Sequence, residues 1–326
     1  MDSGRTATAP SGVIDEAVQC LPAPALRPYI AGYCGYRQDG VPPTRHRGMP
    51  SPFLTLIFTL DDPLTVELHP DPRQAPARYD ALLGGLHTTS ALITHGGRQS
   101  GIQVALSPLG ARALLHLPAG ELANADLPAD AVLGRLADEV RARLRDAPDW
   151  QQRFAVLDRV LWRSARPESV VPPQVVRAWD LLVRSGGAMS ASVLAKDVGW
   201  SGRHLAGRFH TEIGLSPKAA ARVIRFDRAR RLLVVRACGR GGDVLAGRDS
   251  ADGPAGAYRP GSPNGLADLA ADCGYFDQAH LAREFRSLAG CAPSRWLAEE
   301  FRNVQAFAAP SAAEWTADED SGAVHH

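Results

Sequence analysis

The front part of the chain alternates apolar and polar positions in the manner of β-strands. In the stretch "PFLTLIFTL" (52–60), every second residue falls on the same face: Leu54, Leu56, Phe58 and Leu60. After a "DDP" turn, "LTVEL" alternates again, which predicts a hairpin, and "GIQVALSP" predicts a further strand. Several short strands at this spacing favour a sandwich or a barrel over residues 21–106.

Beyond residue 110 the apolar period becomes helical. One stripe recurs every four residues, at Val132, Leu136, Val140 and Leu144, and predicts a helix over 131–147. A second helix is predicted over 150–165, behind Asp149 as its N-cap. Together, the apolar stripes of the two predicted helices are larger than a small barrel needs to cover its core. This excess favours a contact between two copies of the chain. Two adjacent prolines, Pro172 and Pro173, then mark a boundary, after which nearly every segment has the pattern of a short helix.

The helical part spells one unit twice, as "LAKDVGWSGRHLAGRFHTEIGLSP" (194–217) and "LAADCGYFDQAHLAREFRSLAGCAP" (269–293). Matching letters lie 75 residues apart before the turn and 76 after it, because the second copy has one more residue in the turn. Each unit holds a short helix, a turn glycine, an N-cap (Ser201 or Asp277) and a second helix. The inward residues of the second helices are Leu205 and Phe209 in one copy, and Leu281 and Phe285 in the other. The pattern predicts two helix-turn-helix units.

Charge is concentrated beside the first unit. The whole chain has a net charge of +1, yet residues 199–237 hold nine arginines or lysines against only Glu212 and Asp227. Such a local excess is what binding to phosphates requires. The five cysteines form no C-x-x-C pair, and there is neither a signal-peptide core nor an apolar run long enough to span a membrane. These features predict a cytoplasmic protein without a disulfide framework.

The segment from about residue 173 to 301 resembles the DNA-binding domain of the AraC/XylS family of transcriptional regulators. The two quoted units and the basic stretch between them, "AAARVIRFDRARRLL", carry the resemblance, which covers about two-fifths of the chain. It implies an α+β protein: an N-terminal β-rich, cupin-like domain with trailing helices, and a C-terminal all-α domain whose two helix-turn-helix motifs are joined by a connecting helix. The function implied is that of a sequence-specific transcription factor, responsive to an effector, which reads two adjacent major-groove segments.

The resemblance also assigns contact residues. The residues expected to touch bases are Arg203, His204, Ala206, Gly207, Gln278, Ala279, His280, Ala282 and Arg283. Those expected to touch phosphates are Ser201, Arg208, Arg222, Arg225 and Arg286. Because Ala206 and Gly207 have no side-chain reach, we expect Arg203 to do most of the base recognition in the first unit.

The domain boundaries follow from these patterns. We expect a flexible leader (1–20), an effector-binding and dimerisation domain (21–166), a linker (167–173), the DNA-binding domain (174–303) with a flexible Gly/Pro/Asp-rich insertion (238–265), and a disordered tail (304–326). The insertion sets the two units farther apart than is usual in the family. Double-stranded DNA is the main expected partner. The others are a small-molecule effector, a second copy of the chain and, for an activator, RNA polymerase.

Metal binding, enzymatic activity and protein interaction would each require other features in the sequence. His46, His87 and His95 lack the tight H-x-H…E spacing of cupin metal sites, so neither a metal nor another cofactor is expected. An enzymatic or DNA-repair front domain fused to the DNA-binding domain is the alternative. The front segment, however, shows no Pro-Cys-His-Arg nucleophile and no G-x-S-x-G elbow, and no enzyme is predicted. A protein-interaction module that does not bind DNA is a third interpretation.

Overall fold

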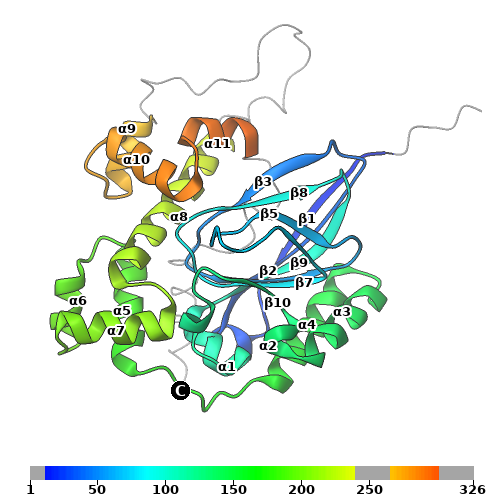
Figure 1. Ribbon diagram of the computed structural model, residues 1–326, viewed down its shortest axis with the longest axis horizontal. Coiled ribbons are helices and arrows are strands. Elements are labelled where there is room, and N and C mark those ends of the chain that lie inside the picture. Colours follow the sequence, from blue (N-terminus) through cyan, green and yellow to red (C-terminus); the bar gives the residue numbers. More distant parts are fainter. Residues whose placement is uncertain (1–11, 239–264, 301–326) are drawn as a thin grey trace, which may run out of the picture.

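The alternating front part folds into two antiparallel sheets in the computed structural model, which describes residues 12–238 and 265–300 (Figure 1). The first sheet has, in spatial order, β1 (Ile14–Cys20), β2 (Ile30–Asp39), β9 (Gln99–Leu106), β4 (Leu54–Thr59), β7 (Ala81–Gly84) and β10 (Asp126–Pro128). The second has β3 (Thr44–Gly48), β8 (Ala91–His95), β5 (Leu64–Leu68) and β6 (Ala77–Tyr79).

Strand β4 shows why the two sheets pack. The side chains of its predicted apolar face lie beside those of the neighbouring strand β9. Leu56 is paired with Val104 and Phe58 with Ile102, and all four residues are fully buried. The other face carries Ile57, which belongs to a separate cluster with apolar residues of β5, β7 and β8. Both faces of β4 are therefore covered, and the second cluster fills the space between the sheets.

The predicted leader is shorter than expected. Residues 14–20 form β1, an edge strand that pairs antiparallel with β2 from Ile14↔Asp39 to Cys20↔Tyr33. Most of its side chains are exposed, so the strand has little apolar alternation to reveal it in the sequence. Residues 1–11 lie outside the described residues.

Short helices close one end of the sheets. They are η1 (Pro24–Leu26), η2 (Pro108–Gly110), α1 (Ala111–Leu115), η3 (Ala119–Leu122), α2 (Asp130–Leu133), α3 (Arg135–Asp146) and α4 (Trp150–Ser164). The helix predicted over 131–147 is broken in two, because Gly134 adopts a φ of 57° between α2 and α3. The second helix is confirmed, and Asp149 caps it by accepting a 2.8 Å hydrogen bond from the Gln152 amide.

The apolar stripes of these helices are covered within one chain. Val140 and Leu144 of α3 are fully buried, as is Leu157 of α4, and all three belong to the main core. Val132 and Leu136 of the first stripe are half-buried, so most of the two stripes serves the core of its own chain.

The rear part of the chain is wholly helical in the described residues. It consists of α5 (Pro173–Arg184), α6 (Ala191–Asp197), α7 (Gly202–Ile213), α8 (Pro217–Cys238), α9 (Leu266–Asp272), α10 (Gln278–Ala289) and α11 (Pro293–Glu300). Figure 1 shows α5, α6 and α7 at one end of α8, and α9, α10 and α11 at its other end. The predicted α+β class, with a β-rich front domain and a helical rear domain built from two helix-turn-helix units, is confirmed. Within the predicted insertion (238–265), residues 239–264 lie outside the described residues, as does the predicted tail (304–326).

Candidate nucleic-acid interface

The two helix-turn-helix units share the same turn. Gly199 follows α6 with a φ of 70°, and Gly274 follows α9 with a φ of 71°. A Cβ atom at either position would meet nothing within 4 Å. The left-handed backbone, rather than crowding, is therefore the reason that both turns favour glycine.

Both recognition helices start at the predicted caps. The Ser201 Oγ accepts a 3.2 Å hydrogen bond from the His204 amide at the start of α7. The Asp277 Oδ1 accepts one of 2.6 Å from the His280 amide at the start of α10. Equivalent caps fix equivalent first turns in the two units.

An aromatic ring supports the histidine in each first turn. The Trp200 ring meets the His204 ring edge-on at a centroid distance of 4.5 Å, and Tyr275 meets His280 in the same way at 5.3 Å. The predicted base contacts include the two histidines but neither of the aromatic residues. The signal was available, because an aromatic residue follows the turn glycine in both copies.

The predicted base-contacting residues lie on the outward side of α7 and α10, in one group per helix. Arg203, His204, Gly207, Gln278, Ala279 and Arg283 are exposed, whereas Ala206, His280 and Ala282 are half-buried. Within the described residues (12–238 and 265–300), neither the Arg203 nor the Arg283 side chain forms an ion pair. Both guanidinium groups are thus available to a ligand outside the protein.

The predicted phosphate-contacting residues divide into two kinds. Arg286 is exposed and has no side-chain partner in the described part of the chain, and Ser201 is an exposed cap. Arg208 lies 3.6 Å from the buried Glu212 carboxylate, one turn along α7. These three residues lie on or beside the recognition helices.

The two arginines predicted on the connecting helix also have partners inside the protein. The Arg222 Nε donates a 2.7 Å hydrogen bond to Glu284 of α10, and its terminal nitrogen lies 3.2 Å from the Ser287 hydroxyl. The Arg225 guanidinium lies over the Tyr275 ring, 5.8 Å from its centroid. These groups hold the second unit against α8, a use that the charge count alone did not reveal.

Farther along α8, two more arginines form internal pairs. Arg230 and Arg231 each donate to the Asp227 carboxylate, at 2.8 and 2.7 Å. Burial alone would raise the pKa of Asp227, but Arg231 and Arg230 together hold that pKa below its ordinary value. The basic stretch found in the sequence is therefore partly neutralised within the fold.

The first unit is docked on the front domain through the C-terminal end of α7. The Arg112 guanidinium of α1 donates to both carboxylate oxygens of Glu212, at 2.6 and 3.0 Å. Glu212 is only 1% exposed, and α7 also packs against η2 and η3. A bidentate pair of this kind fixes orientation as well as distance.

The second unit reaches the front domain at a separate place. The Arg47 amide donates a 2.8 Å hydrogen bond to Glu300 at the end of α11, and the Arg47 guanidinium pairs with the same carboxylate. The Ser90 hydroxyl donates to the Ala289 carbonyl at the C-terminal end of α10, at 3.1 Å. The docking contacts of both units thus use helix C-termini and leave the N-termini of α7 and α10 uncovered.

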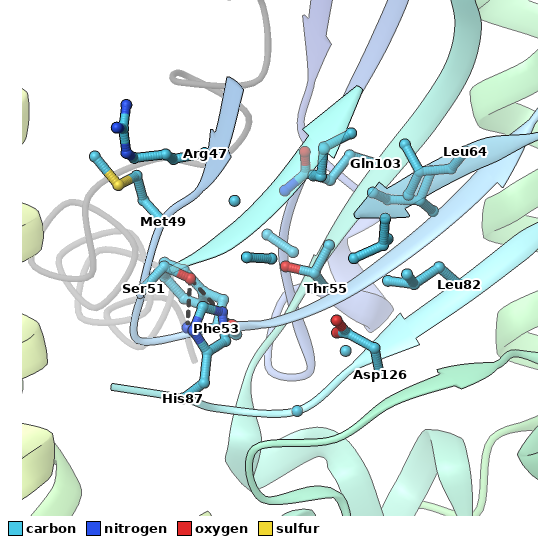
Figure 2. Close-up of a pocket in the computed structure, with 18 of the residues that line it drawn as sticks. Arg47, Met49, Ser51, Phe53, Thr55, Leu64, Leu82, His87, Gln103 and Asp126 are labelled. Carbon is cyan, nitrogen blue, oxygen red and sulfur yellow. Dashed lines mark hydrogen bonds between the residues drawn. The ribbon is translucent and has the colours of Figure 1, made fainter. Parts of the chain in front are cut away.

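A cavity of about 100 Å³ lies between the sheets and the helical domain. Its apolar lining comes from both sheets, while Arg230, Arg231, Trp296 and Glu300 of the helical domain also border it. Figure 2 shows Thr55, Gln103 and Asp126 around the same space, with His87 and Phe53 beside it. A molecule in this cavity would touch both domains.

The polar groups of the cavity are held in place by the protein. The Asp126 Oδ2 lies 2.8 Å from the His69 Nδ1, and the Gln74 amide bonds to the Asp126 backbone. The His87 Nδ1 lies 2.6 Å from the Thr89 carbonyl, and burial lowers the pKa of His87 although nearby Asp126 opposes that shift. His87 is thus a hydrogen-bonding group of the cavity wall, and its lowered pKa favours the neutral imidazole.

No metal centre is formed by the described residues. The His46 and His95 rings are neighbours on β3 and β8, with centroids 5.9 Å apart, but His87 lies elsewhere, in the cavity wall. Among residues 12–238 and 265–300, no group of three His, Cys, Asp or Glu side chains could hold a metal ion. No helix within those ranges is both long and apolar enough to cross a membrane.

Comparison with protein families matches residues 18–128 to a domain of unknown function (DUF6597). The match covers the front domain from within β1 to β10 and none of the helix-turn-helix units. Comparison with characterised protein sequences finds no match.

Comparison with solved structures finds ToxT from Vibrio cholerae. ToxT from strain O395 is 10% identical, with a TM-score of 0.42 over 82% of this chain and 96% of that one. A second crystal form of ToxT gives 10% and 0.44 over 82% and 97%. Wild-type ToxT with a bound unsaturated fatty acid gives 10% and 0.43 over 83% and 95%. At these TM-scores the likeness assigns no ligand or partner to this chain.

Proposed function

We propose that this protein is a sequence-specific DNA-binding transcription factor of the AraC/XylS type, in which α7 and α10 each enter a major groove. The observation that carries the proposal is a pair of matched recognition helices joined by one connecting helix, α8. Their turns, caps and aromatic–histidine contacts repeat, and their outward faces carry unpaired arginines.

The length of α8 supports a paired contact. An α-helix of 22 residues spans about 33 Å at 1.5 Å per residue. Successive major grooves on one face of DNA lie about 34 Å apart. The helix thus offers a span of the order of one groove spacing, and α10 and its turn contact it at Arg222, Arg225 and Phe226.

The two recognition helices offer different sets of side chains to the bases. In α7, Arg203 is the long side chain suited to a bidentate contact with guanine, beside His204. In α10, Gln278, His280 and Arg283 offer three hydrogen-bonding groups. Ser201, Arg208 and Arg286 flank these residues and serve the phosphates, while Arg222 and Arg225 position α10.

The cavity supports the effector-responsive part of the proposal. Groups of both domains border it, among them Arg47 and Glu300, which also form one of the docking pairs. A bound small molecule can change the docking of the helical domain only if it binds two arrangements of the protein unequally. A site shared between the domains meets that condition, because movement of α8 or α11 would change the site itself.

The other proposed partners follow from this role. For an activator, RNA polymerase is the further partner. A second copy of the chain is the remaining proposed partner.

Selection of bound sequences from a random pool of double-stranded DNA tests the proposal. We expect a recurrent site with two parts about ten base pairs apart, bound at least 1,000-fold more tightly than random DNA at physiological salt. Equal affinity for selected and random DNA would refute sequence-specific binding. The full-length protein serves throughout, and binding is followed by fluorescence anisotropy at several salt concentrations.

A further inference from the structure

The extra residue in the turn of the second unit is Phe276. Tyr275 takes the place of Trp200, and Asp277 takes the place of the Ser201 cap, so Phe276 has no counterpart in the first unit. Its side chain is 93% exposed, which is the largest exposure among the large apolar residues that the structure describes.

Phe276 does not serve the fold of its own unit. An apolar residue just before an N-cap commonly packs on the fifth residue after it, which here is Leu281. Leu281 is fully buried by other groups, and Tyr275 takes the inward position at 5% exposure. The Phe276 ring therefore gives up nearly all the burial that an aromatic side chain can gain on folding.

The backbone of Phe276 is nonetheless fixed. Its amide donates a 3.3 Å hydrogen bond to the His280 Nδ1, and the His280 ring in turn rests on Tyr275. The ring is thus presented from a defined point at the start of α10, beside the exposed Gln278 and about two turns before Arg283. The N-terminal residues of a recognition helix are the ones that meet base edges in the major groove.

We propose that Phe276 is a further specificity-determining residue, whose ring packs on the C5-methyl group of a thymine in the segment bound by α10. A phenyl ring has no hydrogen-bonding group for phosphates or for guanine, whereas the thymine methyl is the apolar feature of the major groove, and phenylalanine is among the residues that contact it. This inference rests on the proposed function.

Replacement of single thymines by uracil tests the proposal. Uracil keeps the base pair and removes only the methyl group. On a site selected with the wild-type protein, Phe276→Ala should lower affinity on the order of tenfold and leave affinity for random DNA unchanged. At one thymine in the half bound by α10, uracil should lower wild-type affinity by a similar factor and have no effect on Phe276→Ala.

Two controls separate this contact from general effects. Leu68→Ala removes another exposed apolar side chain, 60% exposed on β5 of the front domain, and should leave DNA binding unchanged. Thermal unfolding of Phe276→Ala should coincide with that of the wild type, because the ring is not packed.

Each contrary outcome has its own meaning. The thymine contact would be overturned if Phe276→Ala bound the selected site as tightly as the wild type. It would also be overturned if the affinity difference between the two proteins persisted at every position where uracil replaces thymine. Either result would leave the proposed function intact. Wild-type protein that prefers no DNA sequence would overturn the proposed function, and this inference with it.

Discussion

The two helix-turn-helix units are alike where they fold and different where they face outward. The turn glycines differ in φ by only 1°, and both helices begin at a side-chain cap. On the outward face, Gly202 and Gly207 of the first unit stand where the second has Gln278 and Arg283, and Arg203 stands where the second has Ala279. A repeated scaffold can therefore carry two different recognition surfaces, since separate residues serve folding and contact.

The units also differ in how they are anchored. The first is tied to the front domain by Glu212, which is 1% exposed, and Arg112. The second is tied to α8 by Arg222 and Glu284, whose side chains are 29% and 20% exposed. Loss of the arginine therefore leaves a fully buried carboxylate in the first unit and a partly exposed one in the second.

The largest expected effect comes from breaking that first anchor. Arg112→Ala leaves the Glu212 charge buried, with only Arg208 at 3.6 Å as a partner, and should lower the free energy of unfolding by about 3 kcal/mol. Arg222→Ala, the matched change in the second unit, should cost about 1 kcal/mol. Urea unfolding measures both.

The double variant Arg112→Ala/Glu212→Gln is the control for the buried charge. It should recover a large part of the loss, since no unpaired carboxylate remains. Equal costs for Arg112→Ala and Arg222→Ala would contradict the difference between the two anchors.

An intermediate effect is expected from the base-contacting arginines. Arg203→Ala should weaken binding to a selected site by 10- to 100-fold, about 1–3 kcal/mol, because the first unit has no other arginine at its base-contacting positions. Arg283→Ala should cost less, since Gln278 and His280 remain. Affinity for random DNA, measured in parallel, should fall much less for both variants. If Arg203→Ala weakens selected and random DNA alike, its contact is with phosphate.

The smallest effect on the free energy of unfolding is expected at a core position where the two units differ. Cys273 of the second unit stands where the first has Val198. Burial raises the pKa of Cys273 from 9.0 to about 11, so the thiol stays protonated in the folded protein at pH 8. A raised pKa means that the stabilising contribution of the neutral thiol is complete below pH 9 and is lost as the pH rises through 11.

Two measurements examine this position. Alkylation with iodoacetamide at pH 8, followed by peptide mass spectrometry, should leave Cys273 unmodified until urea unfolds the protein. Cys273→Val should change the free energy of unfolding by less than about 1.5 kcal/mol and leave DNA binding unaltered. Rapid native alkylation would show that the second unit opens locally at this position.

The sequence was sufficient for what is local. Turn glycines, caps and the inward Leu and Phe positions act within a few residues of each other, so the repeat predicted both units. The edge strand β1 was missed because its side chains are mostly exposed, and its role depends on pairing with β2. The break at Gly134 was missed because the apolar stripe continues across it.

Contacts between distant segments could not be predicted in this way. Arg112 and Glu212 are 100 residues apart, and Arg47 and Glu300 are 253 apart. Nothing near either residue in the sequence marks its partner. The same holds for Arg222, which carries the charge expected of a phosphate contact and uses it on Glu284.

The open space at Gly207 bears on how such a protein could change its target over generations. A Cβ atom there would meet nothing within 4 Å, and the position lies in the middle of α7. Replacing a mid-helix glycine by almost any other residue raises helix propensity, by up to about 1 kcal/mol for alanine. In the proposed mode of binding, a single mutation at Gly207 therefore adds a side chain toward the bases while the domain gains stability, which makes the first unit the easier one to redirect to a new DNA sequence.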